Sequence, residues 1–120
     1  MARAPTPMGK ALRKLRVDSG ERIFDLAKAL DYTTSFVSAL ELGKKAIPDD
    51  FADKVIRHYK LKGADAESFR RDVRLSAQSV KVAMADKSDL SRELAVAFAR
   101  SFPTLDDKKA KELLDALEGL

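Results

Sequence analysis

Cysteine is absent from this chain of 120 residues, which excludes disulfide bonds and thiolate metal sites. Stability must then come from a packed hydrophobic core or from association with another chain. With 45% hydrophobic residues, the chain can bury a modest core and is not disordered by composition. Its length suits one compact domain, or a small domain with an appendage.

The sequence also has little of what an enzyme needs. It contains one histidine, His58, no Gly-rich phosphate loop and no carboxylates paired at metal-ligand spacing. His58 is predicted to be a surface or boundary residue. The acidic pairs at 49–50 and 106–107 stand at expected helix starts, where they complement the helix dipole without a metal ion. We therefore expect no enzyme: no catalytic residue, no metal site and no cofactor.

Long hydrophobic runs are missing as well. No apolar run approaches the roughly 18 residues of a transmembrane helix. The first ten residues, MARAPTPMGK, lack the apolar segment of a secretory signal. We expect a soluble, cytoplasmic protein that has no membrane partner.

Positive charge is concentrated in the first half of the chain. Residues 1–62 hold 13 Lys and Arg against 8 Asp and Glu, whereas residues 63–120 hold 10 against 11. A basic balance favours nucleic acid only weakly by itself. It carries more weight where it coincides with a DNA-binding motif.

Such a motif lies between Arg22 and Lys45, in RIFDLAKALDYTTSFVSALELGKK. Apolar residues recur at helical spacing on both sides of the short segment 31–33. Two helices joined this tightly must cross at a steep angle, which predicts a helix-turn-helix. Thr33 is the expected N-cap of its second helix, over 34–42, and Gly43 the expected end. The second helix of this motif is the one presented to the DNA major groove.

Helical patterns flank the motif and predict an all-α chain. One helix is expected from Met8 to a cap at Gly20, one has Pro48 in its first turn, and one spans about 64–79. Near the carboxyl end, the pattern predicts two more helices. Their expected N-caps are Ser88 and Thr104, with Pro103 ending the first of the two.

Residues 80–84 break the helical period. Val80, Val82 and Met84 alternate with other residues, as in a β-strand. The segment is either a tail of the preceding helix or one short strand that pairs with its own copy across a dimer.

The segment from Met8 to about Leu61 resembles the lambda-repressor-like DNA-binding domain of Xre and Cro/C1 transcriptional regulators. The resemblance rests on GKALRKLR, on LAKAL, on TTSFVSALELGKK and on Pro48 opening the next helix. It implies a five-helix domain and a homodimer on a palindromic double-stranded DNA operator. The expected organisation is a flexible arm over 1–7, the DNA-binding domain over 8–62, and a helical extension for dimerisation over 63–120.

The period of the second motif helix and the resemblance together predict the site. The resemblance implies a structural ion pair between Arg16 and Glu41, which suits the position of Glu41 at the margin of the apolar face. The expected base-facing residues are Thr34, Ser35, Ser38, Ala39 and Leu42, and the expected phosphate contacts are Thr33, Lys44, Lys45, Arg22, Lys10 and Arg13.

Two features depart from the family pattern. The base-facing residues include no Arg, Gln or Asn, so bidentate base contacts are missing, and Leu42 is alternatively a core residue. Ile23 stands where many members have a phosphate-binding glutamine, so that role passes to Arg22 or to backbone amides.

The expected function is transcriptional regulation, as a dimeric repressor of a phage, prophage or operon promoter. The alternative is an antitoxin that binds a toxin through its carboxy-terminal half and represses its own operon. The helices of that half have apolar faces, for which three uses are open: to complete a helical hairpin, to join two subunits or to hold a partner.

Overall fold

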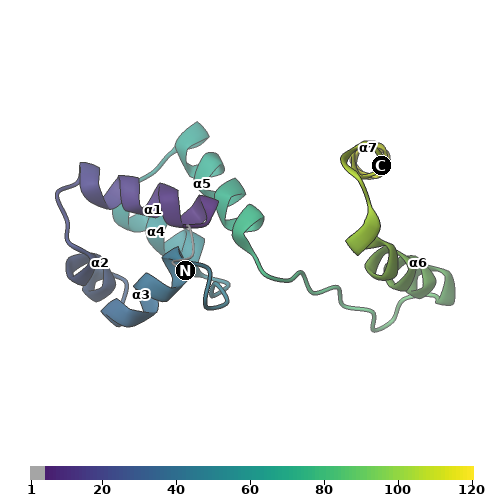
Figure 1. Cartoon of the computed structure of the whole chain (residues 1–120), viewed down its shortest axis with the longest axis horizontal. Coiled ribbons are helices and arrows are strands. Elements are labelled where there is room, and N and C mark those ends of the chain that lie inside the picture. The colour runs from purple at the N-terminus through teal and green to yellow at the C-terminus, as the bar shows by residue number, and fades with distance from the viewer. Residues whose placement is uncertain (1–4) are drawn as a thin grey trace. The chain divides into compact units, whose positions relative to one another are not determined.

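The computed structural model describes residues 5–120, and the chain is all-helical in that range, as the sequence predicts. It divides into two units, residues 1–80 and 81–120 (Figure 1). No helix among the described residues has the length and apolar character needed to cross a membrane. The helices of the first unit are α1 (Pro7–Asp18), α2 (Ile23–Ala29), α3 (Thr34–Glu41), α4 (Phe51–Tyr59) and α5 (Gly63–Ser76), and those of the second are α6 (Asp89–Ser101), the 3-10 turn η1 (Phe102–Thr104) and α7 (Asp107–Glu118).

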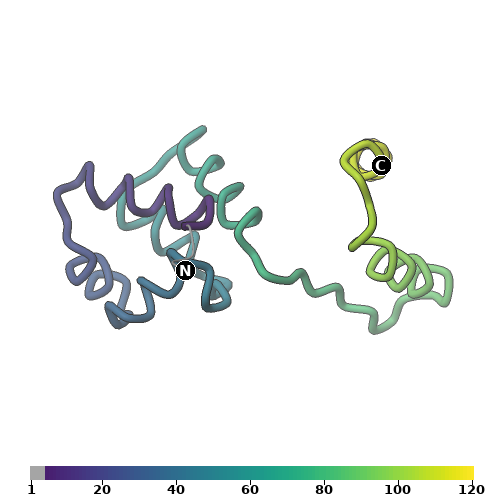
Figure 2. The backbone as a smooth tube through the Cα atoms, in the orientation of Figure 1, coloured from purple at the N-terminus to yellow at the C-terminus, as the bar shows by residue number. Residues whose placement is uncertain are grey.

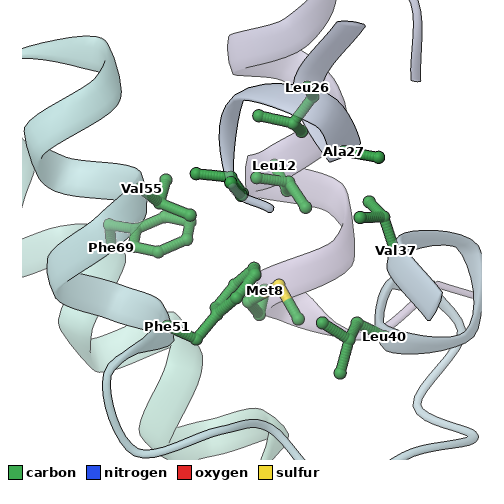
Figure 3. Close-up of a cluster of buried hydrophobic side chains, with 10 residues drawn as sticks. Met8, Leu12, Leu26, Ala27, Val37, Leu40, Phe51, Val55 and Phe69 are labelled. Carbon is green, nitrogen blue, oxygen red and sulfur yellow. The ribbon is translucent and has the colours of Figure 1, made fainter. Parts of the chain in front are cut away.

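The core of the first unit draws side chains from all five of its helices (Figure 3). Its members recur at helical spacing along α1, α2 and α3, so each helix turns one apolar face inward. Burial of these side chains is the main driving force for folding this unit. The buried hydrophobic residues are Met8, Leu12, Leu26, Ala27, Leu30, Val37, Leu40, Phe51, Val55 and Phe69.

Helix α5 belongs to the first unit, although the sequence predicts a boundary near residue 62. Its Phe69 is buried in the core, and Val73 packs against the same cluster. The Met8 backbone N–H donates to Ser76 Oγ at 2.8 Å, which ties the start of α1 to the end of α5. The unit therefore extends to Val80, and the expected boundary falls inside it.

Several helix ends of the first unit lie where the sequence predicts them, but the start of α4 does not. The Thr33 hydroxyl caps α3, and Gly20 and Gly43 follow α1 and α3 with φ of 77° and 71°. Pro48, however, lies before α4, in a turn in which its carbonyl accepts a hydrogen bond from the Phe51 N–H at 3.0 Å. Helix α4 begins only at Phe51, where the first buried side chain enters the core.

Residues 5–7, expected to be part of a loose arm, are tied to the fold. Thr6 is the N-cap of α1, its hydroxyl accepting from the Gly9 N–H at 3.0 Å. The Thr6 N–H also donates to the Glu41 carbonyl at 3.2 Å, and Pro7 is the first residue of α1. The rest of the expected arm, residues 1–4, lies outside the described residues.

Capping in the second unit agrees with the sequence at one helix and differs at the other. Ser88 caps α6 as predicted, its hydroxyl accepting from the Ser91 N–H at 3.1 Å. The prediction for Thr104 is wrong, since this residue lies in η1 and Asp106 caps α7. The Asp106 carboxylate accepts from the Lys109 N–H at 2.8 Å, a stronger cap than a hydroxyl provides.

Residues 77–88 connect the last helix of the first unit to α6 without regular structure (Figure 2). Because α5 ends at Ser76, the interpretation of 80–84 as a tail of that helix is wrong. Residues 80–84 are extended and exposed but form no strand within the described chain. Pairing with a second copy stays a prediction.

The helices of the second unit do not form the hairpin that the sequence allows. Figure 1 shows α7 end-on while α6 runs across the view, so the two helices do not lie alongside each other. Neither helix contains a buried residue. Their apolar faces are therefore left open within residues 81–120.

A polar cluster links α4 to the loop between α1 and α2. His58 Nε2 lies 2.8 Å from Glu21 Oε2, and the Ser19 hydroxyl donates to Glu21 Oε1 at 2.9 Å. Burial acts to raise the pKa of Glu21, but hydrogen bonding with His58, Tyr59 and Ser19 outweighs it and leaves this pKa lowered. Burial and the nearby Glu21 carboxylate raise the pKa of Tyr59. His58, expected only as a surface or boundary residue, thus holds two segments together.

Helices α1 and α3 approach each other closely at Gly9. A Cβ atom on Gly9 would lie 2.1 Å from the Glu41 carbonyl oxygen and 2.8 Å from the carbonyl carbon. Both are backbone atoms of α3, so they cannot move aside as a flexible side chain would. Gly9 therefore fixes the distance between α1 and α3.

We expect Gly9→Ala to lower the free energy of unfolding of the first unit by about 3 kcal/mol, because the added methyl forces α1 and α3 apart. Urea unfolding followed by tyrosine fluorescence measures this unit, since Tyr32 and Tyr59 both belong to it. Lys10→Ala, at the adjacent exposed position, is the control and should change stability by less than about 0.5 kcal/mol. Equal stability of the two variants would contradict the close approach.

Candidate nucleic-acid interface

The buried face of α3 and the aromatic residue before it hold this helix in place. Val37 and Leu40 are buried in the core. The Tyr32 ring packs against Phe36 with centroids 5.0 Å apart. Lys54 of α4 lies over the Tyr32 ring at 4.6 Å from its centroid, and it also donates to the Leu30 carbonyl. The turn between α2 and α3 is therefore braced from α4.

The residues predicted to face DNA bases lie away from the buried pair Val37 and Leu40, and they differ in exposure. Ser35 is exposed, whereas the other four are half-buried. Leu42, for which a core position was the alternative, is the half-buried C-cap residue of α3. The accessible polar groups are therefore short hydroxyls. The half-buried members are Thr34, Ser38, Ala39 and Leu42.

Thr33 is exposed, but its hydroxyl is already engaged. It accepts from the Phe36 N–H at 3.1 Å as the N-cap of α3. A phosphate contact by Thr33 would therefore use its hydroxyl as a donor or its backbone N–H. Its first role is to start α3.

Three of the predicted phosphate-binding lysines are exposed. Lys44 and Lys45 follow the end of α3, where the Lys44 N–H donates to the Ala39 carbonyl at 2.9 Å. Lys10 lies on α1. Among the described residues, none of these three side chains takes part in an ion pair. Their charges are available to an anionic partner.

The start of α2 is less suited to phosphate than expected. Arg22 is the exposed N-cap of α2, but its backbone N–H donates to Asp25 Oδ2 at 2.9 Å. The Asp25 carboxylate therefore occupies one of the backbone donors proposed for phosphate and adds a negative charge beside it. Of the two groups expected to bind phosphate here, the Arg22 N–H is already engaged, and a contact by the Arg22 side chain stays a prediction.

Glu41 lies almost fully buried at the junction of α1 and α3, and the expected ion pair with Arg16 is present. Arg16 Nη2 lies 3.4 Å from Glu41 Oε1, and Arg13 Nη2 lies 3.6 Å from Glu41 Oε2. The Arg16 side chain is 16% exposed and that of Arg13 is 51% exposed. Arg13, predicted only as a phosphate contact, therefore also pairs with Glu41. Its three-residue spacing from Arg16, which places both on one side of α1, was the available signal.

Phe24 is a surface residue that the sequence reasoning missed. Its side chain is 62% exposed on α2, although it is a large hydrophobic residue. It borders a shallow hollow of about 260 Å³ together with Thr33 and Thr34 at the start of α3. The signal was its position outside the apolar stripe formed by Ile23, Leu26 and Ala27.

No family model, curated protein or solved structure matches this chain. Among residues 5–120 no group of His, Cys, Asp or Glu side chains is arranged to hold a metal ion. The site is therefore characterised by its own geometry: a helix anchored on one face by core residues and Glu41, with short polar groups on its other side and two exposed lysines, Lys44 and Lys45, shortly after its end.

We expect Glu41→Ala to lower the free energy of unfolding by about 3 kcal/mol, because it leaves the largely buried Arg16 without its partner. Asp18→Ala removes the same charge from an exposed pair with Lys14 and should cost less than about 1 kcal/mol. Urea unfolding followed by tyrosine fluorescence compares the two. A Glu41→Ala variant with unchanged stability and altered DNA sequence preference would refute a structural role.

Proposed function

We propose that this chain is a sequence-specific double-stranded DNA-binding transcriptional regulator of the lambda-repressor-like helix-turn-helix type. It acts as a dimeric repressor that places two copies of α3 in the major groove of a palindromic operator. The observation that supports this proposal best is the position of α3. Its apolar side is fixed in the core, its hydroxyl-bearing side is accessible, and unpaired Lys44 and Lys45 follow it directly.

In this mechanism, phosphate contacts position α3 and short side chains read the bases. Lys44, Lys45 and Lys10 neutralise phosphates, with Arg22 and the exposed part of Arg13 as further contacts. Base discrimination comes from the group Thr34, Ser35, Ser38, Ala39 and Leu42. Hydroxyls bind several bases and methyl groups contact thymine, so DNA shape contributes a large share of specificity.

A second candidate function is that of an antitoxin. The open apolar faces of α6 and α7 favour it, because an antitoxin needs a protein-binding surface in addition to a DNA-binding surface. Expression with the neighbouring gene of its operon tests it. Stable co-purification of that gene product, lost when the apolar face of α6 is made polar, would support the antitoxin role.

Selection of binding sites from random double-stranded DNA with the full-length chain tests the proposed function. We expect inverted repeats whose half-sites carry modest sequence information, because α3 lacks the long side chains that make bidentate contacts. Selection at two salt concentrations should enrich the same sites, with weaker binding at the higher concentration. Failure to enrich any sequence would reject sequence-specific DNA binding.

We expect simultaneous replacement of Lys44 and Lys45 by Gln to weaken binding about tenfold or more on every DNA sequence alike. The slope of log affinity against log salt concentration should fall by about 2, because two phosphate contacts are lost. The control is the double replacement of Lys62 and Arg71 by Gln, which removes the same charge from exposed positions at and near α5. A loss confined to one sequence would assign the lysines to base reading instead.

A further inference from the structure

Helix α6 carries an apolar stripe that no other described part of residues 81–120 covers. Leu90 is 77% exposed, Leu94 68% and Phe98 48%. Phe102 of η1 continues the stripe, with its ring centroid 5.6 Å from that of Phe98. A helix with so little buried surface gains almost nothing from packing, and packing is the main source of helix stability in proteins. The stripe is therefore a candidate surface for association with another chain.

The charges beside the stripe indicate which chain that is. At about 100° per residue, Glu93 and Arg100 lie on the same flank of the stripe, seven residues apart. In heptad terms, Leu90 and Ala97 are equivalent, Leu94 and Ser101 are equivalent, and Glu93 and Arg100 both occupy position g. Neither of these two charges has an ion-pair partner among the described residues.

Two antiparallel copies of such a helix bring position g of one against position g of the other. Glu93 of each copy then faces Arg100 of the other, so both pairs join unlike charges. A parallel arrangement of two α6 helices gives no such match. The stripe is thus complementary to itself in one orientation, as an isologous two-fold interface requires.

We infer that α6 associates with α6 of a second copy of this chain, antiparallel and about a two-fold axis. The Leu90, Leu94 and Ala97 side chains lie in the buried seam, with Phe98 at position e bordering it on one side and two Glu93–Arg100 pairs on the other. Self-association needs no DNA, so it is tested separately; its role in joining two DNA-binding units on an operator rests on the proposed function.

A charge exchange tests both the partner and the orientation. Glu93→Arg and Arg100→Glu each place like charges together twice and should raise the dimer dissociation constant about tenfold. The variant carrying both substitutions restores unlike pairs and should return to the affinity of the natural chain. Sedimentation equilibrium of the full-length chain without DNA measures the constants, and circular dichroism checks that helix content is equal.

The opposite outcome for the double variant would overturn the proposal. If α6 instead packs parallel to α7 of another chain, Glu93 meets Lys111, and the double variant associates as weakly as the single ones. A chain that stays monomeric at hundreds of micromolar would show that a different protein covers the stripe.

A second pair of variants locates the seam. Leu94→Glu should make the chain monomeric, whereas Ala99→Glu, which adds the same charge on the opposite side of α6, should leave the dimer intact. Equal effects of the two variants would contradict the proposed face. Binding of the Leu94→Glu variant to a single operator half-site tests the first unit alone, so loss of dimerisation and absence of DNA binding remain distinguishable.

Discussion

The contact between the Glu41 carboxylate and the arginines of α1 determines how α3 is held. A carboxylate this deeply buried is costly without cations, and Arg16 and Arg13 supply them. Because Gly9 has no side chain, the Glu41 backbone can lie against it, and the Thr6 N–H donates to the Glu41 carbonyl. One residue at the end of α3 is therefore fixed through its side chain and its backbone at once. The exposed side of α3 derives its rigidity from this anchor.

A rigid recognition helix with short side chains on its exposed face contacts DNA bases differently from a helix with long side chains there. Long side chains reach base edges over several ångströms and lose conformational entropy when they do. Under the proposed DNA binding, Ser35, Ser38 and Thr34 lose little conformational entropy, but they reach a base only if the backbone of α3 approaches the groove closely. Close approach demands an accurately placed helix, which is what the Glu41 anchor and the Lys54–Tyr32 brace provide. The short side chains on α3 thus require the tight anchoring of this helix.

The sequence predicted the helical class and the α2–α3 turn because both depend on local spacing, whereas the Arg16–Glu41 pair joins residues 25 positions apart and was implied by the family resemblance. Thr33 and Gly43 act through hydrogen bonds to residues within one helical turn. The features it missed depend on segments far apart in the chain. Gly9 is essential only because residue 41 comes to lie against it, and α5 joins the first unit only because Phe69 reaches a core built by α1 and α4.

Pro48 and Thr104 show a different limit. Both residues are suited to helix starts, yet in each case the helix begins a few residues later. Phe51 is where the chain of α4 first enters the core, and Asp106 offers a charged acceptor where Thr104 offers a hydroxyl. Propensity alone ranks such neighbouring positions almost equally, so packing and charge decide between them.

Division of the chain into two units also changes what sets operator spacing. A rigid dimer interface would hold two copies of α3 about 34 Å apart, one turn of DNA. Residues 77–88 span up to about 40 Å when fully extended, so an interface built from α6 leaves a range of separations open. Joining two chains through α6 still raises the effective concentration of the second α3 once the first is bound. In the proposed dimer, affinity then comes from linkage, and the half-site spacing is selected by the DNA contacts of residues 1–80.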